Sequence, residues 1–531
     1  MLTIRLNGVD VEFEDDSSSL LDVLRDRFAC QSVKDGCSPQ GQCGCCTVWV
    51  DGSPRVACVT PSRRVSGRAV TTLEGLDPAL RTVWVDAFVD AGASQCGFCT
   101  PGILMRLAAL SDRPAKPDAV RTSLLAHLCR CTGWQSIVEA ANRVLAGDAP
   151  GDGAGSAEPR DPLLAAWRAQ VEGPAFQTSG APVVLGQGGF ASDTAPEGAT
   201  VAICDDGRVS LADGLARARR GLPKVQGRRS GVALRHPLDV PEGEWAITLQ
   251  TTWVEPAYLE PDASWCLPGG IPTSPLANGG AFGGKRRSGV ADEARRLADA
   301  EQRPVLALWT REEVVRRGPK RPPVAIGLRS DGTGVMRVAS PDGSADLVPL
   351  HSAVAEVAPG LDVEGRDVAG PPVGAELRGA GWVEAAVVLA ALRAKSVGTV
   401  GRGVPVEITG RTGGRALVSI GDHDRVAVEV WAGEVLDETT LRSYCFGAVH
   451  QALGWVWSEG VAVDEDGRVQ DLTVRSFGVL SARDTPEVTV TVHPSDRLPV
   501  NGSDAVFAAT ATAAWLADDL APRWPTRRSA R

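Results

Sequence analysis

The sequence predicts an α+β protein of several domains: a small unit of sheet and helix, an all-helical unit, and a longer region that mixes strands with helices. Three observations support this prediction. The 531 residues exceed the usual length of one domain. Ten of the thirteen cysteines lie before residue 132, so the start of the chain differs in chemistry from the rest. Residues 147–161 are rich in Gly, Ala, Asp and Pro without apolar periodicity, which is typical of a linker.

The composition narrows the class of protein. Hydrophobic residues make up 43% of the chain and charged residues 23%, as in ordinary globular proteins. A net charge of −10 argues against a surface for nucleic acid or anionic lipid. Residues 1–8 contain no apolar signal core and no twin arginine, and no apolar run reaches the length of a membrane span. We expect a cytoplasmic protein that binds neither nucleic acid nor membrane.

The first 76 residues contain the pattern of a small sheet with one helix. Residues 2–6 and 9–13 alternate polar and apolar side chains around an Asn-Gly pair, which favours a tight hairpin. A run of serines precedes the apolar stripe of residues 20–28 and can cap a helix there. Residues 47–50 then predict a strand that ends at an Asp-Gly turn.

The pattern becomes helical from residue 77 to residue 146. Apolar residues recur at helical spacing in four segments, at about 80–89, 100–110, 120–128 and 137–145. Thr100 is expected to cap the second helix, with Pro101 as its first residue. Thr132 and Gln135 have the spacing of a capping box before the fourth helix.

The first group of candidate metal ligands is Cys37, Cys43, Cys46 and Cys58. Plant-type ferredoxins hold a 2Fe–2S cluster with Cys-x4-Cys-x2-Cys and a distant fourth cysteine. Here the first interval has five residues, and a loop containing glycine can absorb the extra one. An alternative is that Cys45 replaces one of the four as a ligand. We expect the remaining nearby cysteine, at position 30, to be a small buried apolar residue.

The second group pairs Cys96 and Cys99 with Cys129 and Cys131. Both pairs precede a predicted helix N-terminus, where the macrodipole and peptide N–H groups favour an anionic cluster and raise its potential. Clustered cysteines in a cytosolic chain favour metal ligation over disulfides. A four-cysteine zinc site is the alternative, although Cys-x-Cys is less usual there. The sequence therefore predicts two 2Fe–2S clusters.

Three stretches around these cysteines resemble a known family. Residues 36–48, 95–102 and 128–133 resemble the iron–sulfur part of the xanthine dehydrogenase/aldehyde oxidase family of molybdenum hydroxylases, which also includes carbon monoxide dehydrogenase. The resemblance covers residues 1–146, and its motifs are specific. It implies that Gln95 touches a molybdopterin.

The same resemblance implies the boundaries of the domains. Residues 1–76 would be a β-grasp, plant-type 2Fe–2S ferredoxin-like domain that passes electrons outward. Residues 77–146 would be an all-α, four-helix 2Fe–2S domain nearer the pterin. After the linker at 147–161, residues 162–531 resemble a shortened, mixed α/β molybdopterin-binding region of the family.

Four segments of the long region carry this second resemblance, and they occur in the order of the family: residues 255–261, 279–285, 371–381 and 447–454. In the glycine-rich loop 279–285, the resemblance implies that the cofactor is bound by Gly280, Ala281, Phe282 and Gly283. Ala281 stands where another glycine is usual, and a structural turn is the alternative for this loop.

Two further residues are implied at the molybdenum. Arg378 matches an arginine beside the metal's oxo ligands, although an ordinary surface or salt-bridged arginine is the alternative. The family's catalytic glutamate should lie in a Gly-x-Gly-Glu segment, and the best match ends in Asp504 instead. Aspartate is one methylene shorter, so the base would be withdrawn from the substrate. The alternative for Asp504 is a loop residue or a cap of the apolar helix 506–516.

These expectations lead to competing functions. The first is a compact hydroxylase with two 2Fe–2S clusters and molybdopterin, acting on an aldehyde or an N-heteroaromatic compound. The second is an electron-transfer protein with a degenerate molybdopterin region, and the third is a zinc-stabilised scaffold. No FAD-binding domain can be placed in this chain, so we expect an external FAD subunit or another redox acceptor, in a homodimer or hetero-oligomer.

Overall fold

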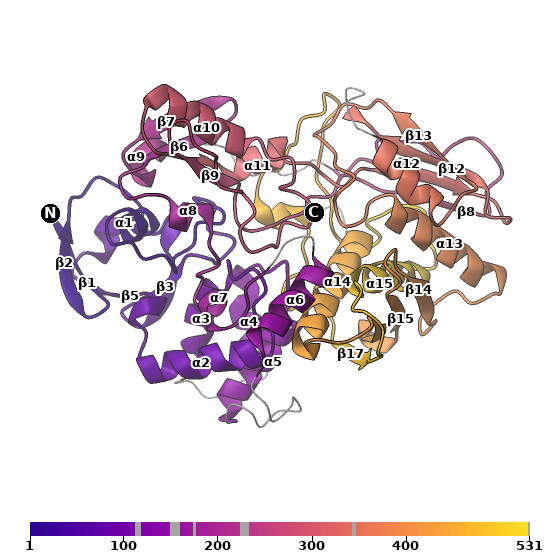
Figure 1. Ribbon diagram of the computed structural model, residues 1–531, viewed down its shortest axis with the longest axis horizontal. Helices are drawn as coiled ribbons and strands as arrows, with labels where there is room; N and C mark the ends of the chain where they lie inside the picture. The colour runs from indigo at the N-terminus through magenta and orange to yellow at the C-terminus, as the bar shows by residue number, and fades with distance from the viewer. Residues whose placement is uncertain (112–117, 149–159, 174–176, 224–232, 342–346, 529–531) are drawn as a thin grey trace.

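The computed structural model describes residues 1–111, 118–148, 160–173, 177–223, 233–341 and 347–528. Most of the predicted linker at 147–161 lies outside these residues. The described chain is a mixed α+β protein with four separate β-sheets. Figure 1 shows the sheet nearest the N-terminus at the left, a group of helices below the centre, and two of the later sheets at the right.

The N-terminal unit is a sheet with one helix, as the sequence predicted. Its strand order is β2-β1-β5-β3-β4, with β1 at Leu2–Leu6, β2 at Val9–Phe13, β3 at Thr47–Val50, β4 at Ser53–Val56 and β5 at Ala69–Thr71. The hairpin between β1 and β2 turns at Asn7 and Gly8, which have φ of 50° and 88°. Helix α1 (Leu20–Asp26) begins with a capping box between Ser19 and Asp22.

Helices fill the next part of the chain. They are α2 (Pro78–Asp90), α3 (Thr100–Ala108), α4 (Ala119–Ser123) and α5 (Gln135–Ala146). Two predicted helix starts are wrong. Cys99, not Thr100, caps α3. The capping box before α5 does not form, because Trp134 precedes the helix with a φ of 67° and its buried indole donates to the Leu480 carbonyl. Tertiary packing overrides the local signal here.

Short helices connect this unit to the second sheet. They are α6 (Pro162–Glu172), α7 (Ala181–Val184) and α8 (Ala191–Thr194). The second sheet has the order β7-β6-β10-β9, with β6 at Thr200–Asp205, β7 at Arg208–Ala212, β9 at Ala263–Cys266 and β10 at Val305–Trp309. Helices α9 (Leu215–Arg220), α10 (Val290–Glu301) and α11 (Arg311–Arg317) lie around it (Figure 1).

The last two sheets form the other side of the molecule. One has the order β13-β12-β11-β8, with β8 at Ile247–Gln250, β11 at Val324–Leu328, β12 at Gly334–Ala339 and β13 at Leu361–Arg366. The other has the order β14-β15-β16-β17, with β14 at Val406–Thr409, β15 at Arg415–Ile420, β16 at Val426–Trp431 and β17 at Val488–His493. The accompanying helices are α12 (Val348–Ala355), α13 (Trp382–Ser396), α14 (Glu438–Trp457) and α15 (Ser503–Ala517).

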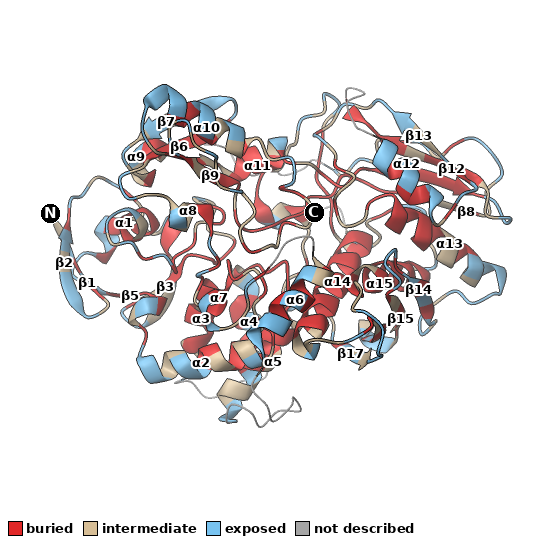
Figure 2. Ribbon diagram, viewed as in Figure 1, coloured by how far each residue is buried: buried red, intermediate tan, exposed pale blue. Residues whose placement is uncertain are grey.

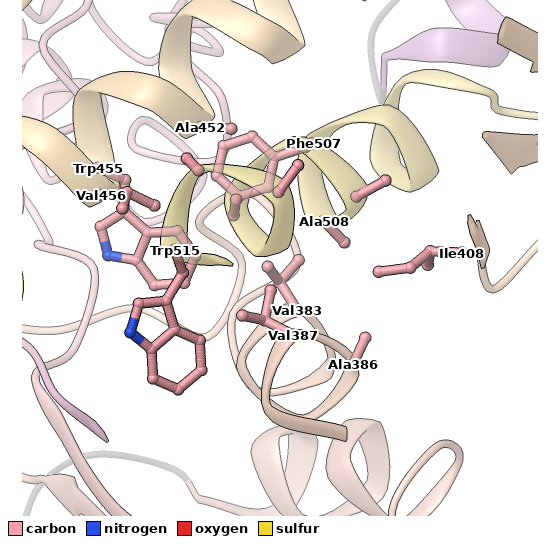
Figure 3. Packing of buried hydrophobic residues seen from close by; sticks show 14 of the residues in the cluster. Val383, Ala386, Val387, Ile408, Ala452, Trp455, Val456, Phe507, Ala508 and Trp515 are labelled. Atoms are coloured by element: carbon pink, nitrogen blue, oxygen red, sulfur yellow. The ribbon is translucent and has the colours of Figure 1, made fainter. Parts of the chain in front are cut away.

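A large apolar core joins these two sheets. At its centre α15 packs against both α13 and α14, and the Trp455 ring of α14 stacks on the Phe507 ring of α15 (Figure 3). Nearly all of α14 and α15 is buried (Figure 2), so these helices are covered on every side rather than along one stripe. In the part of the chain that the structure describes, no helix is long and apolar enough to cross a membrane.

Candidate functional site

The first cysteine group gathers where the loop after α1 meets β3 and the turn that follows β4. Its four thiols are buried, and they contact one another in the order Cys43, Cys37, Cys58, Cys46. The peptide N–H of Cys43 points to the Cys37 sulfur at 3.3 Å, and that of Cys58 points to the Cys46 sulfur at 3.4 Å. Hydrogen bonds from Cys43 and Cys58 hold the pKa of the Cys37 thiol well below its ordinary value.

A tight turn absorbs the extra residue between the first two cysteines. The N–H of Gln40 donates to the Cys37 carbonyl at 2.6 Å, and Gly41 has a φ of 68°. An L side chain at Gly41 would also meet Val59, because its Cβ would lie 2.8 Å from that side chain. The five-residue interval therefore still brings Cys43 against Cys37.

The second group lies at the start of α3 and just before α5. The sulfurs of Cys96 and Cys131 are 3.7 Å apart, and the thiol of Cys99 hydrogen-bonds that of Cys129. Thr132 belongs to the predicted capping box that does not form. Its hydroxyl lies 3.2 Å from the Cys129 sulfur. Hydrogen bonds from Cys99 and Thr132 lower the pKa of Cys129 to about 6.

The arrangement of these thiols fits iron–sulfur clusters. All of the described cysteines are free, so neither group is tied up in a disulfide. In the described residues, no set of three or more His, Cys, Asp and Glu side chains is arranged to hold a single metal ion. The second group instead meets as two pairs of sulfurs, which suits a two-iron cluster in which each iron takes two thiolates.

The backbone segments that carry the two groups are in contact. The N–H of Leu128 donates to the carbonyl of Cys43 at 3.0 Å, and Leu128 is bonded to Cys129 of the second group. Helix α3 packs closely because Gly102 has no side chain: a Cβ there would lie 2.3 Å from the Gly44 carbonyl. Backbone glycines thus allow the two cysteine groups to approach each other.

The glycine-rich loop 279–285 covers the second group. A Cβ on Gly280 would lie 3.1 Å from the Cys96 sulfur and 3.4 Å from the Cys131 sulfur. Gly283 packs against the carbonyl of Glu376, and Ala281 is buried. The loop therefore lies on the cysteines rather than around an open space.

Phe282, Arg378 and Asp504 lie near one another although they come from three segments of the chain. The N–H of Arg378 donates to the Phe282 carbonyl at 3.3 Å, and its guanidinium lies 5.2 Å from the ring centres of both Phe282 and Phe507. Burial lowers the pKa of Arg378 to about 10, against the opposite effect of the Asp504 charge. Burial raises the pKa of Asp504, which lies in the first turn of α15.

Gln95 lies at a different place. Its amide donates to the carbonyl of Cys131 at 2.9 Å and to both the carbonyl and the hydroxyl of Ser443 at 3.1 Å. It borders a small cavity with Tyr444, whereas Phe282 and Arg378 border another. Gln95 and Arg378 therefore border two different cavities.

The space at Arg378 is small. The cavity that it shares with Phe282, Trp455 and Phe507 has a volume of about 30 Å³, which leaves room for about two or three water molecules. Cofactor pockets usually measure about 300–1,000 Å³. A larger cavity of about 140 Å³ lies between α1 and the second sheet, but it contains none of the predicted site residues. The cavity at Arg378 is therefore smaller than the pockets that usually hold such a cofactor.

Buried ion pairs between distant segments were not predicted from the sequence. Arg130, which separates Cys129 from Cys131, makes a bidentate pair with Glu459 at 2.5 and 2.7 Å. The motif marked Arg130 as part of the cysteine group, but no local pattern indicates its partner 329 residues away.

Comparison with known sequences finds relatives for the beginning of the chain, whereas comparison with solved structures finds a match over the whole chain. A family model described as a [2Fe-2S] binding domain matches residues 72–142. The small FeS subunit of nicotinate dehydrogenase from Eubacterium barkeri is 39% identical over 121 residues, which are 22% of this chain and 76% of that relative. The iron-sulfur-binding subunit of xanthine dehydrogenase from Escherichia coli O157:H7 is 38% identical over 138 residues, which are 25% of this chain and 86% of that relative.

A solved structure resembles this chain over nearly its whole length. The aldehyde oxidoreductase from Desulfovibrio gigas superposes with a TM-score of 0.71, and the match covers 99% of each chain. The two sequences are 15% identical over this match, so it shows a shared fold.

Proposed function

Because this chain belongs to the xanthine dehydrogenase/aldehyde oxidase family of molybdenum hydroxylases, we propose that its N-terminal part is an electron relay of two 2Fe–2S clusters. The observation that carries the proposal is the gathering of eight thiols, seven of them buried and that of Cys96 half-buried, into two sets of four. The ligands are Cys37, Cys43, Cys46 and Cys58 in one set and Cys96, Cys99, Cys129 and Cys131 in the other.

The protein's own groups prepare both sites for an anionic cluster. A 2Fe–2S cluster supplies reversible transfer of one electron at a time. The peptide N–H groups of Cys43 and Cys58 donate to sulfurs of the first set, and α3 directs its N-terminus at the second. These features stabilise negative charge on sulfur where a reduced cluster would place it.

The contact between the two sets supports transfer from one to the other. The N–H of Leu128 donates to the carbonyl of Cys43, a ligand of the first set. Leu128 directly precedes Cys129, a ligand of the second set. The close approach of Gly102 to the Gly44 carbonyl packs α3, at the second set, against the loop of the first set. Electrons would therefore pass through packed protein without water between the sites.

The source and the acceptor of the electrons lie outside this relay. Because the cavity at Arg378 is too small for molybdopterin, we propose that a partner subunit carries the molybdenum and oxidises an aldehyde or an N-heteroaromatic compound. The names of the two relatives, both of them iron–sulfur subunits, support such a hetero-oligomer. An external FAD subunit or another redox protein in the cytoplasm would take the electrons.

One observation favours a second candidate function, hydroxylation by this chain itself. Phe282, Arg378 and Asp504 meet at one place although they come from three segments, which is how a retained site would look. If Asp504 were the base of such a site, replacing it with glutamate would preserve or raise the activity. A loss of activity in Asp504→Glu would count against that role.

Metal analysis of protein purified from cells that make the molybdenum cofactor separates the two candidates. The relay requires iron and no stoichiometric molybdenum, together with uptake of about two electrons per chain in an anaerobic reductive titration, one for each cluster. One molybdenum per chain would instead support hydroxylation by this chain. Protein that takes up no electrons would refute both.

A further inference from the structure

Thr132 lies beside the second set of ligands, and its hydroxyl is not used as the sequence predicted. A capping box would have bonded this hydroxyl to the first turn of α5, but that helix has no side-chain cap. Gln135, the other member of the predicted box, donates its amide to Glu139 at 3.2 Å. The Thr132 side chain is buried, and its oxygen lies 3.2 Å from the Cys129 sulfur. The hydroxyl therefore contacts a ligand of the second set instead of the helix.

The chemistry of the ligand determines the direction of this hydrogen bond. A cysteine binds a metal as the thiolate, which has no proton to donate. A threonine hydroxyl carries one proton and can donate it to an acceptor. When Cys129 holds iron, the hydrogen bond can therefore run only from the Thr132 hydroxyl to the Cys129 sulfur.

Helix α14 holds the backbone on both sides of Thr132. The Gln451 amide of this helix donates to the Arg130 carbonyl at 3.1 Å. Gly133 packs against the Phe446 carbonyl, because a Cβ on this glycine would lie 2.3 Å from the carbonyl oxygen. Both neighbouring segments are thus fixed to one buried helix, which keeps the Thr132 side chain at the sulfur.

Thr100 provides a contrast within the same set. It directly follows Cys99, as Thr132 directly follows Cys131, and it is also buried. Its hydroxyl lies 2.9 Å from the hydroxyl of Ser94 and so has a partner other than sulfur. A threonine next to a ligand is therefore not enough, and the contact with sulfur distinguishes Thr132.

We propose that Thr132 is a positioning residue that donates its hydroxyl to the Cys129 sulfur and thereby raises the reduction potential of the second cluster. The inference rests on the proposed two-cluster relay. Reduction adds one negative charge to a cluster, so a hydrogen bond to ligand sulfur stabilises the reduced form more than the oxidised form. The hydroxyl thus favours the arrival of an electron at the second cluster.

The test is a potentiometric titration followed by electron paramagnetic resonance on variants of the full chain. The signal of the second cluster is the one that disappears in Cys99→Ser. In Thr132→Val the midpoint potential of this cluster should fall, because valine has nearly the same shape but no hydroxyl. In Thr132→Ser the potential should return to the wild-type value, because the hydroxyl is present again. The potential of the first cluster should not move in either variant.

Thr100→Val is the matched control. It removes a buried hydroxyl next to a ligand of the same set, but one that contacts Ser94 rather than sulfur. Neither potential should change in this variant. If Thr132→Val does not retain the second cluster, Thr132→Ala takes its place as the variant without a hydroxyl.

Three results would overturn the inference. The first is an unchanged second potential in Thr132→Val. The second is an equal fall in Thr132→Ser, because the methyl group rather than the hydroxyl would then determine the potential. The third is loss of the second signal in both variants without a hydroxyl, because Thr132 would then retain the cluster rather than tune it. If the wild-type protein gave no pair of signals, the relay itself would fail, so the two failures are distinguishable.

Discussion

The pKa of the cysteine thiol is lowered at some positions of this chain and raised at others. Hydrogen bonds from Cys99 and Thr132 lower the pKa of Cys129 to about 6, whereas burial raises the pKa of Cys30 to about 12. Thiolates ligate metals and neutral thiols do not. Contact with other thiols distinguishes the two cases: in two pairs of neighbouring thiols the pKa of one thiol is lowered, as in Cys37 and Cys129, and that of the other is raised, as in Cys43 and Cys99.

Replacement of one ligand should remove one cluster and leave the other. In Cys99→Ser we expect one of two paramagnetic signals to disappear on reduction, because serine replaces a thiolate of the second set. Electron paramagnetic resonance of the dithionite-reduced protein measures this loss. The control is Cys445→Ser, at a buried free cysteine of α14, which should keep both signals. Two unchanged signals in Cys99→Ser would refute the assignment of ligands.

Two buried histidines should make the fold sensitive to acid. Burial, with a further effect of nearby arginines, lowers the pKa of both His127 and His450 to about 3. An unfolded histidine binds its proton at a pH of about 6.5, so stability is lost as the pH falls from 6.5 towards 3. Each histidine contributes about 1.4 kcal/mol per pH unit within that window.

His450→Gln should reduce this acid sensitivity. The glutamine amide can still donate to the Leu480 carbonyl, which the ring nitrogen contacts at 3.0 Å, but it does not titrate. Urea unfolding at pH 7.5 and pH 5 should give a smaller difference in unfolding free energy than in the wild type. His351→Gln, at an exposed position, should leave the difference as it is. An equal difference in all three proteins would contradict the account.

At the scale of the elements, the absence of a side chain at Gly102 allows α3 to pack closely against the loop of the first cysteine group. Gly102 lies in this helix, where alanine is usually more stable than glycine by about 1 kcal/mol. A Cβ there would however lie 2.3 Å from the Gly44 carbonyl and 2.8 Å from the Cys45 carbonyl. The steric cost of separating two backbones, about 1–3 kcal/mol, exceeds the gain in propensity.

Gly102→Ala should therefore lower the stability and separate the two cysteine groups. The expected results are a lower midpoint of thermal unfolding and a weaker magnetic coupling between the two reduced clusters. Gly421→Ala is the control, because its φ is −89° and no atom lies within 4 Å of the added Cβ. A Gly102→Ala protein as stable as the wild type would show that the close contact is not maintained.

Local signals predicted the elements well and their ends less well. The Asn-Gly hairpin and the serine cap of α1 formed as expected, because both depend on residues a few positions apart. The start of α5 could not be predicted, since Trp134 is held in a left-handed conformation by packing against residues near 480. The spacing of the cysteines indicated two groups because the members of each group lie close in sequence.

Across the whole molecule, buried ion pairs fix the N-terminal part to the rest. Arg130 and Glu459 are both buried, and their bidentate pair joins the second cysteine group to the segment after α14. The sequence could not predict this pair or the volume at Arg378. The latter depends on how Phe282, Trp455 and Phe507, from distant segments, pack together.

Arg130→Met should destabilise the protein strongly. The change leaves the Glu459 carboxylate buried without its partner, which usually costs about 3–5 kcal/mol. The loss should be smaller at pH 5 than at pH 8, because burial already raises the pKa of Glu459 and the unpaired carboxyl can take up a proton. Chemical unfolding at the two pH values measures the difference.

The control for this change is an exposed ion pair. Arg425 and Glu487 lie 3.3 Å apart with most of both side chains in solvent, so Arg425→Met should cost about 0–1 kcal/mol. A loss in Arg130→Met no greater than in Arg425→Met would contradict the importance of the buried pair.

The central claim is that this chain holds two 2Fe–2S clusters, and its iron and acid-labile sulfide contents test that claim most directly. Protein purified without oxygen should be coloured and contain about four iron atoms and four sulfides per chain. Colourless protein that contains zinc in place of iron, without sulfide, would contradict the account.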